Sequence, residues 1–218
     1  MVKMFSTLVV ATLLQTGQLA ATAAIRSQTV AEDNVLQAVR MEYQPGAIES
    51  TDTHEYDEVL VPLTTGMSIN LEGKPVEWTV GVAILVPRGA RHQIQNSSNA
   101  VVTFVLVRRN GGTVLPGEQT DPHGVTLVRA EEGEYVRTET FRFEAHSQLW
   151  GIGTRQAGPT VFVLTSDASV RMTIASTISQ SGSRPSGTVW LFEPGMAYGL
   201  ANLSSVPFEA VAISATGR

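Results

Sequence analysis

The residues of this chain best suited to metal or acid–base chemistry lie in two short stretches. The first contains Asp52, His54 and Glu58, and the second contains His92, just after a turn at residues 87–89. Alternate residues of a strand face the same side, so one extended segment would aim all three side chains of the first stretch into a common interior. The nearly all-apolar residues 81–86 must be buried, and the turn after them would bring His92 back along the same wall.

Two imidazoles and one or two carboxylates that converge in this way form a metal site of the two-histidine, one-carboxylate type, with coordination positions left open for substrate or oxygen. A cation would also keep Glu58 ionised in an apolar interior. The apolar residues expected to form that interior are Val82, Ile84, Ile94 and Phe104. The alternative from spacing alone is that the histidines are only hydrogen-bonded and that the acids are solvated.

The composition narrows the class of protein. The 218-residue chain is 43% hydrophobic and 16% charged, with a formal net charge of −5. It can therefore bury a core, and its length fits one domain or two small ones. The acidic balance argues against nucleic acid as a partner, because nucleic acid requires a basic surface. Since there is no cysteine, disulfides, thiolate-bound metals and thiol nucleophiles are excluded.

Residues 1–23 have the features of a signal peptide. Lys3 gives a positive start, residues 5–14 are mostly apolar, and Ala21 and Ala23 form a small-residue cleavage site. The alternative is an amphipathic or membrane-anchoring helix, but the apolar run is shorter than the roughly 20 residues of a spanning helix. No later stretch is long and apolar enough to span a bilayer. We therefore predict a secreted or periplasmic protein with no membrane partner after cleavage.

The rest of the chain has the pattern of short strands separated by Gly, Pro, Asn and Ser. Runs rich in Val, Ile and Thr predict strands at residues 58–63, 67–71, 76–80, 82–86, 92–95, 101–108, 136–143, 160–165, 170–175, 188–192, 198–203 and 208–214. Residues 30–40 could form a short helix, and residues 176–187 have the composition of a mobile loop. Many short strands at regular spacing predict an all-β barrel or sandwich.

Two stretches of the sequence repeat one another. They align without a gap, and their apolar runs coincide. The identical pairs are Gly81 and Gly187, Gly89 and Gly195, Asn96 and Asn202, and Ser98 and Ser204. The alternative is that two hairpins share glycine at their turns by chance. We interpret the repeat as two copies of one β unit.

These residues resemble the two motifs of the cupin superfamily. The family's second motif is glycine, five residues, Pro-x-Gly, two residues, histidine, three residues, asparagine. It is matched at every fixed position by Gly81, Pro87, Gly89, His92 and Asn96. The first motif is glycine, five residues, His-x-His, three or four residues, glutamate, six residues, glycine. Gly46, His54 and Glu58 match it, whereas Asp52 replaces its first histidine and Gly66 comes one residue late.

The resemblance implies two tandem cupin barrels, of the double-stranded β-helix or jelly-roll type, behind the signal peptide. It implies an N-terminal barrel at residues 24–109, a linker at residues 110–134 and a degenerate C-terminal barrel at residues 135–218. In the second copy Tyr198 replaces the motif histidine and Glu193 the proline, so that copy is expected to be metal-free. The sheet edges of such barrels favour a homodimer, because unpaired strand edges seek cover.

Carried over from the family, the metal ligands fall on His54, Glu58 and His92, with Asp52 as an unusual fourth. The implied cofactor is a divalent ion, namely Fe, Mn, Ni, Cu or Zn. Fe or Mn is favoured because the Asp52 carboxylate is a harder ligand than imidazole.

The resemblance implies a metal-dependent enzyme, an oxygenase, decarboxylase, lyase or isomerase, that acts on a small polar organic molecule. In such an enzyme Glu58 either binds the metal or leaves it and acts as the catalytic general base. The alternative is a non-catalytic cupin that binds a ligand, stores protein or serves as a structural module, which the imperfect first motif favours. A third interpretation is a partner-dependent regulatory or assembly protein.

Overall fold

The computed structural model describes residues 24–114, 124–149, 158–175 and 177–216, and these residues form seventeen strands and no helix. The predicted all-β class is thereby confirmed. Within the described ranges no helix has the length and apolarity that a membrane crossing requires. The predicted signal peptide at residues 1–23 lies outside the described residues.

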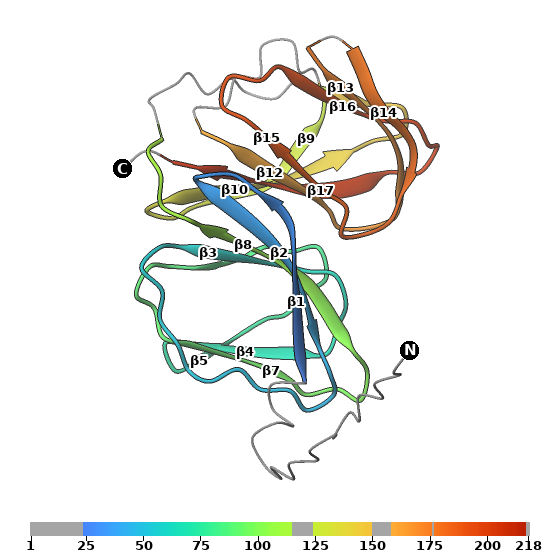
Figure 1. Cartoon of the computed structure of the whole chain (residues 1–218). Helices are drawn as coiled ribbons and strands as arrows, with labels where there is room; N and C mark the ends of the chain where they lie inside the picture. The colour runs from blue at the N-terminus through green and yellow to red at the C-terminus, as the bar shows by residue number, and fades with distance from the viewer. Residues whose placement is uncertain (1–23, 115–123, 150–157, 176, 217–218) are drawn as a thin grey trace, which may run out of the picture.

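Two antiparallel sheets make up the N-terminal half, residues 24–114 (Figure 1). The larger sheet has the order β1 (Ile25–Glu32), β2 (Leu36–Tyr43), β8 (Val102–Arg109), β3 (Glu58–Pro62) and β6 (Ile84–Val86). The smaller has the order β5 (Lys74–Val76), β4 (Met67–Leu71) and β7 (His92–Asn96). The two sheets enclose a core cluster that includes Tyr43, Leu60, Ile94 and Phe104.

The C-terminal half, residues 124–216, repeats this arrangement. Its larger sheet has the order β9 (Thr126–Glu132), β10 (Val136–Phe143), β17 (Phe208–Ala215), β12 (Thr160–Leu164) and β15 (Val189–Phe192). Its smaller sheet has the order β14 (Thr177–Arg184), β13 (Ala168–Ile174), β16 (Tyr198–Asn202) and β11 (Gln148–Leu149). With β1 matched to β9, β2 to β10 and β8 to β17, the two large sheets follow one order. The sequence repeat therefore corresponds to a repeat of topology.

The repeated asparagines have a structural role. The Asn96 amide donates to the carbonyl groups of Tyr43 and Ala100, and its oxygen accepts from Ser98. Asn202 makes the same set of bonds with the equivalent residues of the C-terminal half. Both side chains are buried, so each asparagine satisfies backbone groups that would otherwise be left unpaired. The last position of the second motif thus holds a turn together.

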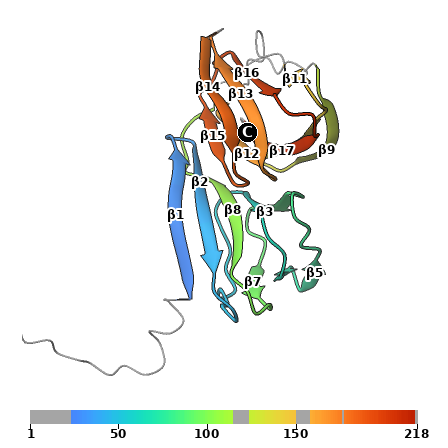
Figure 2. The ribbon, with the colours of Figure 1, turned by 90° about the vertical axis from the view of Figure 1, so that its right-hand side faces the viewer.

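The large sheets of the two halves pack face to face (Figures 1 and 2). Val59 and Val107 on one sheet share a core cluster with Val161 and Val211 on the other. The central strands β3 and β12 are therefore covered on both faces, and every residue of each strand is buried. Because Val59 and Val61 of β3 face the C-terminal half, Glu58 and Leu60 face the interior of the N-terminal half.

Three local predictions are wrong. The predicted strand at residues 76–80 has only its first residue in a strand, because β5 ends at Val76. Residues 30–40 form the end of β1 and the start of β2 rather than a helix, with a turn in which the Asp33 carboxylate accepts from the Val35 and Leu36 N–H groups. The predicted loop at residues 176–187 contains β14, which pairs with β13 along one edge of its sheet. Most of β14 is exposed, which accounts for its Ser- and Thr-rich, loop-like composition.

Three further strands lie where none was predicted, and the shortest of them is β11 (Gln148–Leu149). The other two are β1 and β9. The predicted connection at residues 110–134 contains β9, and β1 precedes the first predicted strand. Both are edge strands with largely exposed side chains, so neither carries the buried apolar run by which the other strands were found.

Candidate metal centre

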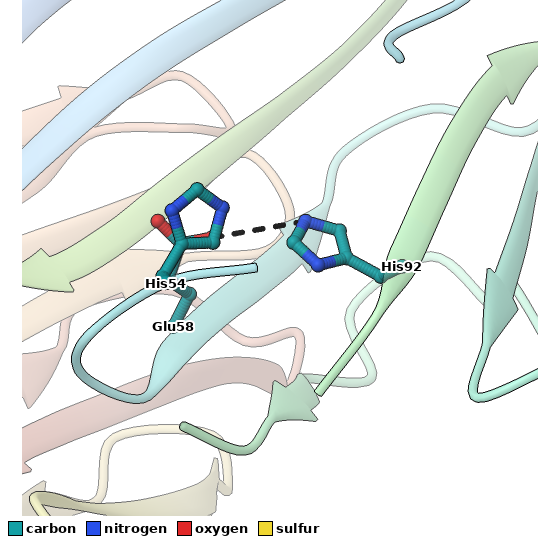
Figure 3. Close-up of side chains that lie close together, drawn as sticks. All are labelled: His54, Glu58 and His92. Atoms are coloured by element: carbon teal, nitrogen blue, oxygen red, sulfur yellow. Dashed lines mark ion pairs between the residues drawn. The ribbon is translucent and has the colours of Figure 1, made fainter. Parts of the chain in front are cut away.

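Three side chains suited to metal binding meet in the N-terminal half. One ligand atom from each of His54, Glu58 and His92 lies within 4.8 Å of the other two (Figure 3). The Nε2 atom of His54 is 3.1 Å from Glu58 Oε2, and the Nε2 atom of His92 is 4.0 Å from the same oxygen. In the described part of the chain no other three His, Asp or Glu side chains come together in this way.

The segment that carries His54 and Glu58 is bent. The bend lies at Glu55 and Tyr56, and β3 begins only at Glu58, so the predicted single extended segment is wrong. His54 and Glu58 therefore meet because the chain turns between them, as the close-up shows (Figure 3). The same bend separates Asp52 from Glu58.

Asp52, the predicted fourth ligand, lies outside the group of three. Asp52 pairs with His92 through an isolated backbone bridge, but its side chain is exposed. One oxygen of its carboxylate accepts a hydrogen bond from the Thr53 N–H. Asp52 therefore acts on the centre in this structure through its charge.

His92 reaches the centre by strand alternation. The buried side chains of β7 are His92, Ile94 and Asn96, and the intervening Gln93 is exposed. This is the shared orientation that the sequence predicts. The Nδ1 atom of His92 lies 3.4 Å from the Ala90 carbonyl oxygen. In the tautomer that donates there, Nε2 keeps its lone pair on the side of Glu58, and such fixed ring orientation is typical of metal-binding histidines.

The turn at residues 87–90 connects the segments that carry the ligands. The Gly89 N–H donates to the His54 carbonyl oxygen at 2.9 Å, and the Ala90 carbonyl faces the His92 ring. Gly89 has a φ of +71°, a conformation that favours glycine. The Pro-x-Gly part of the second motif therefore holds two of the three candidate ligands at fixed places.

Burial favours the uncharged forms of Glu58 and His54. It raises the pKa of Glu58 to about 7, against an attraction from Arg108 that lowers the pKa and repulsions from Glu49 and Asp52 that raise it. The pKa of His54 is lowered by burial and by the neighbouring His92. Burial therefore opposes the ionisation of both groups that meet at the contact between Glu58 and His54. A bound cation would reverse this for Glu58, so the donor set fits a divalent metal.

A cavity of about 160 Å³ adjoins the three candidate ligands. Its apolar wall includes Leu60, Ile94 and Phe104. Two of the four apolar residues that the sequence predicts for this wall, Ile94 and Phe104, line the cavity. Tyr56 and Trp78 do not line it. Tyr56 packs edge-on against Tyr135 of the C-terminal half, and Trp78 packs edge-on against Phe104 and donates to the Thr64 carbonyl oxygen.

Three polar residues that line this cavity were not predicted from the sequence, namely Tyr43, Glu49 and Arg108. The Tyr43 hydroxyl donates to Glu49 at 2.5 Å, and burial followed by this bond raises the Tyr43 pKa. Phe104, Leu106 and Arg108 occupy every second position of β8 and therefore lie on the same face of the strand. This period could have identified Arg108 from the sequence. Glu49 lies outside the regular strands and carried no comparable signal.

Aromatic rings fill the equivalent region of the C-terminal half. Tyr198, at the position of the motif histidine, stacks on Phe192 with ring centroids 3.9 Å apart and planes 8° apart. Phe162 meets both rings edge-on. All three side chains are buried. Packed rings thus stand where the N-terminal half has its candidate ligands.

A family model described as a cupin domain matches residues 39–108, a range that contains all three candidate ligands and the second motif. Residues 39–108 of this chain form a cupin domain. The resemblance seen in the sequence is thereby confirmed for this range. A comparison with curated proteins found no match to this chain.

Solved structures with the same fold include a dioxygenase and variants of it. The salicylate 1,2-dioxygenase from Pseudaminobacter salicylatoxidans matches with a TM-score of 0.71 and 12% identity, over 92% of this chain and 79% of that chain. A variant of that dioxygenase in complex with gentisate matches with a TM-score of 0.69 and 12% identity, over 88% and 74% of the two chains. AerE from Microcystis aeruginosa matches with a TM-score of 0.64 and 8% identity, over 93% and 95%. At these identities the likeness shows the fold.

Proposed function

We propose that this protein binds one divalent metal ion through His54, Glu58 and His92 and uses it as an oxygenase on a small organic acid. The observation that carries the proposal is the meeting of two imidazoles and a buried carboxylate within 4.8 Å beside a cavity. A two-histidine, one-carboxylate set leaves coordination positions open and favours iron or manganese. The fold neighbours support the choice of reaction, since one is a dioxygenase and a variant of it was crystallised with gentisate.

The residues around the cavity have separate tasks in this proposal. A metal ion bound there would supply Lewis acidity and open positions for substrate and oxygen. His92 presents Nε2 because its Nδ1 faces the Ala90 carbonyl oxygen. Glu58 would give its carboxylate to the metal, or would act as general base on leaving it, because a carboxylate beside the metal lies within reach of a bound substrate's proton. The apolar wall keeps water away from the reacting atoms.

The cavity also suggests the substrate class. Its volume of about 160 Å³ is well below the roughly 300–1,000 Å³ of sites for drug-sized ligands, so a single-ring or short-chain acid fits. Arg108 brings a guanidinium to the cavity wall, and its Nε donates to Gln37 at 2.8 Å, which holds the group in place. A guanidinium matches the planar geometry of a carboxylate.

Oxygen uptake by the reconstituted protein tests the proposal. We expect the protein loaded with Fe²⁺ or Mn²⁺ to consume O₂ with salicylate, gentisate or a small aliphatic carboxylic acid, and to bind one metal ion per chain. Absence of stoichiometric metal together with absence of O₂ uptake would overturn the proposal and favour the non-catalytic, ligand-binding alternative.

Replacing the cavity arginine should affect substrate binding more than turnover. Hydrogen bonds to charged groups contribute about 1.5–3 kcal/mol, so we expect Arg108→Gln to raise KM for the acid by about 10–100-fold with a smaller change in kcat. Steady-state O₂ uptake measures both constants. The matched control is Arg91→Gln, since Arg91 is exposed and does not line this cavity. An unchanged KM in Arg108→Gln would exclude this residue from substrate binding.

Export and the two-barrel organisation also belong to this proposal. We propose that residues 1–23 are a signal peptide and that the mature protein is secreted or periplasmic. The chain would comprise two cupin barrels, the first at residues 24–109. The start of the second moves back from the predicted residue 135 to include β9 (Thr126–Glu132), which pairs with β10 in its large sheet. The repeated strand order of the two halves supports this division, and the exposed edge strands β1 and β14 would support a homodimer.

A further inference from the structure

Asp57 is a buried carboxylate that has no role in the chemistry proposed for the cavity. It directly precedes Glu58, only 1% of its surface is exposed, and it does not line the cavity beside the candidate ligands. One carboxylate oxygen accepts from the Arg88 N–H at 2.8 Å, and the other accepts from the Tyr135 N–H at 2.6 Å. Asp57 therefore joins the N-terminal half, through Arg88, to the C-terminal half, through Tyr135.

The bond to Arg88 links Asp57 to the turn at residues 87–90. From this turn the Gly89 N–H holds the His54 carbonyl, and the Ala90 carbonyl faces the His92 ring. Two candidate ligands thus contact the turn directly, and the third is connected to it through its neighbour. For Glu58 this connection runs through the neighbouring Asp57 and its bond to Arg88.

The bond to Tyr135 comes from the tip of the hairpin that connects β9 and β10. At this tip Gly133 lies so close to Asp57 that an added Cβ would stand 2.3 Å from the carboxylate oxygen Oδ2, which only glycine permits. The Tyr135 hydroxyl accepts a hydrogen bond from the Arg88 guanidinium at 2.7 Å, and its ring meets Tyr56 edge-on. Arg109 lies over the same ring. The tip is therefore docked on both segments that lead to the candidate ligands.

We propose that Asp57 is a positioning residue through which the metal-free C-terminal half fixes the metal centre of the N-terminal half. The inference rests on the proposed function, because it assigns a role toward the same metal. The hairpin tip holds one oxygen of Asp57 and the turn holds the other, so Glu58 and the turn before His92 keep a fixed spacing. Without the bond from Tyr135, the bent segment at residues 54–58 keeps the ring contact of Tyr56 but loses the hydrogen bond that fixes Asp57 to the second half. The C-terminal half thereby contributes to metal affinity without contributing a ligand.

Metal titration of two variants tests the proposal. Asp57→Asn keeps the size of the side chain but places an amide N–H₂ against one of the two backbone N–H donors. Gly133→Ala pushes a methyl group onto the same carboxylate from the C-terminal half. Loss of a group that orients a metal ligand typically weakens metal binding by about 10–100-fold, and we expect this for Co²⁺ in both variants by calorimetry. The visible absorption spectrum of the Co²⁺ protein should change as well, because the ligand geometry changes.

The matched control is Tyr135→Phe, which removes the hydroxyl bond to Arg88 but keeps the backbone N–H that binds Asp57. We expect its Co²⁺ affinity and spectrum to equal those of the parent. Far-UV circular dichroism and thermal unfolding should show that all variants are folded without metal. Parent-like Co²⁺ binding by Asp57→Asn, or an equal loss of Co²⁺ affinity in Tyr135→Phe, would overturn the positioning role of Asp57 and leave the proposed function standing. A parent protein that binds no metal would overturn the proposed function and this inference with it.

Discussion

The His92→Ala protein is expected to bind a divalent metal at least about 100-fold more weakly than the parent and to contain no stoichiometric metal after purification. Removing a group that only orients a ligand weakens binding by about 10–100-fold, so removing a ligand should exceed that range. His92 is also the candidate ligand with the least freedom, because its side chain is 3% exposed and its Nδ1 faces the Ala90 carbonyl oxygen. Elemental analysis and a Mn²⁺ or Co²⁺ titration measure the loss.

His146→Asn is the control for the loss of one histidine. His146 is exposed, and its φ of 59° is one that asparagine tolerates better than alanine does. This variant should keep the metal content of the parent, and far-UV circular dichroism should show that both variants are folded. Stoichiometric metal in His92→Ala would contradict the assignment of His92 as a ligand.

The orientation of the His92 side chain could be predicted from the sequence for a simple reason. The stretch at residues 81–96 combines a buried strand, a glycine turn and an alternating strand, and each of these is a local property that the sequence displays. Once β7 is a strand with Ile94 buried, His92 must point the same way. The match to the second cupin motif adds the turn geometry, in which Gly89 holds the His54 carbonyl.

The expectations that failed depended on non-local structure. The bend at Glu55 and Tyr56 breaks the parity between Asp52 and Glu58, and the bend is held from outside by the bonds of Asp57 to Arg88 and Tyr135. These partners lie 31 and 78 residues away along the chain, so no spacing rule reveals them. The edge strands β1 and β9 were missed for the opposite reason. Most of their side chains are exposed to solvent, so these strands lack the alternation of buried and exposed residues by which a strand is predicted.

Replacing Glu58 should stabilise the metal-free protein at neutral pH. Burial raises the pKa of Glu58 from its ordinary value of 4.5 to about 7 in the folded protein. A group whose pKa is higher in the folded state stabilises it fully below the unfolded-state pKa, and this stabilisation is lost as the pH rises through the folded-state pKa. The isosteric Glu58→Gln variant lacks this titration. Its free energy of unfolding relative to the parent should therefore rise by about 3 kcal/mol between pH 4.5 and pH 7 and then level off.

Metal reverses this order, which separates a functional carboxylate from a merely buried one. A metal at 1,000 times its dissociation constant stabilises the folded state by about 4 kcal/mol, which exceeds the roughly 3 kcal/mol that ionised Glu58 costs. The parent with metal should therefore be more stable than Glu58→Gln with metal above pH 7, and urea unfolding with and without Mn²⁺ measures both differences. Glu55→Gln makes the same change on an exposed neighbour and should show neither effect. If Glu58→Gln gains no stability over the parent in the absence of metal, the carboxylate is not held in an unfavourable environment, and the argument that a cation stabilises it there fails.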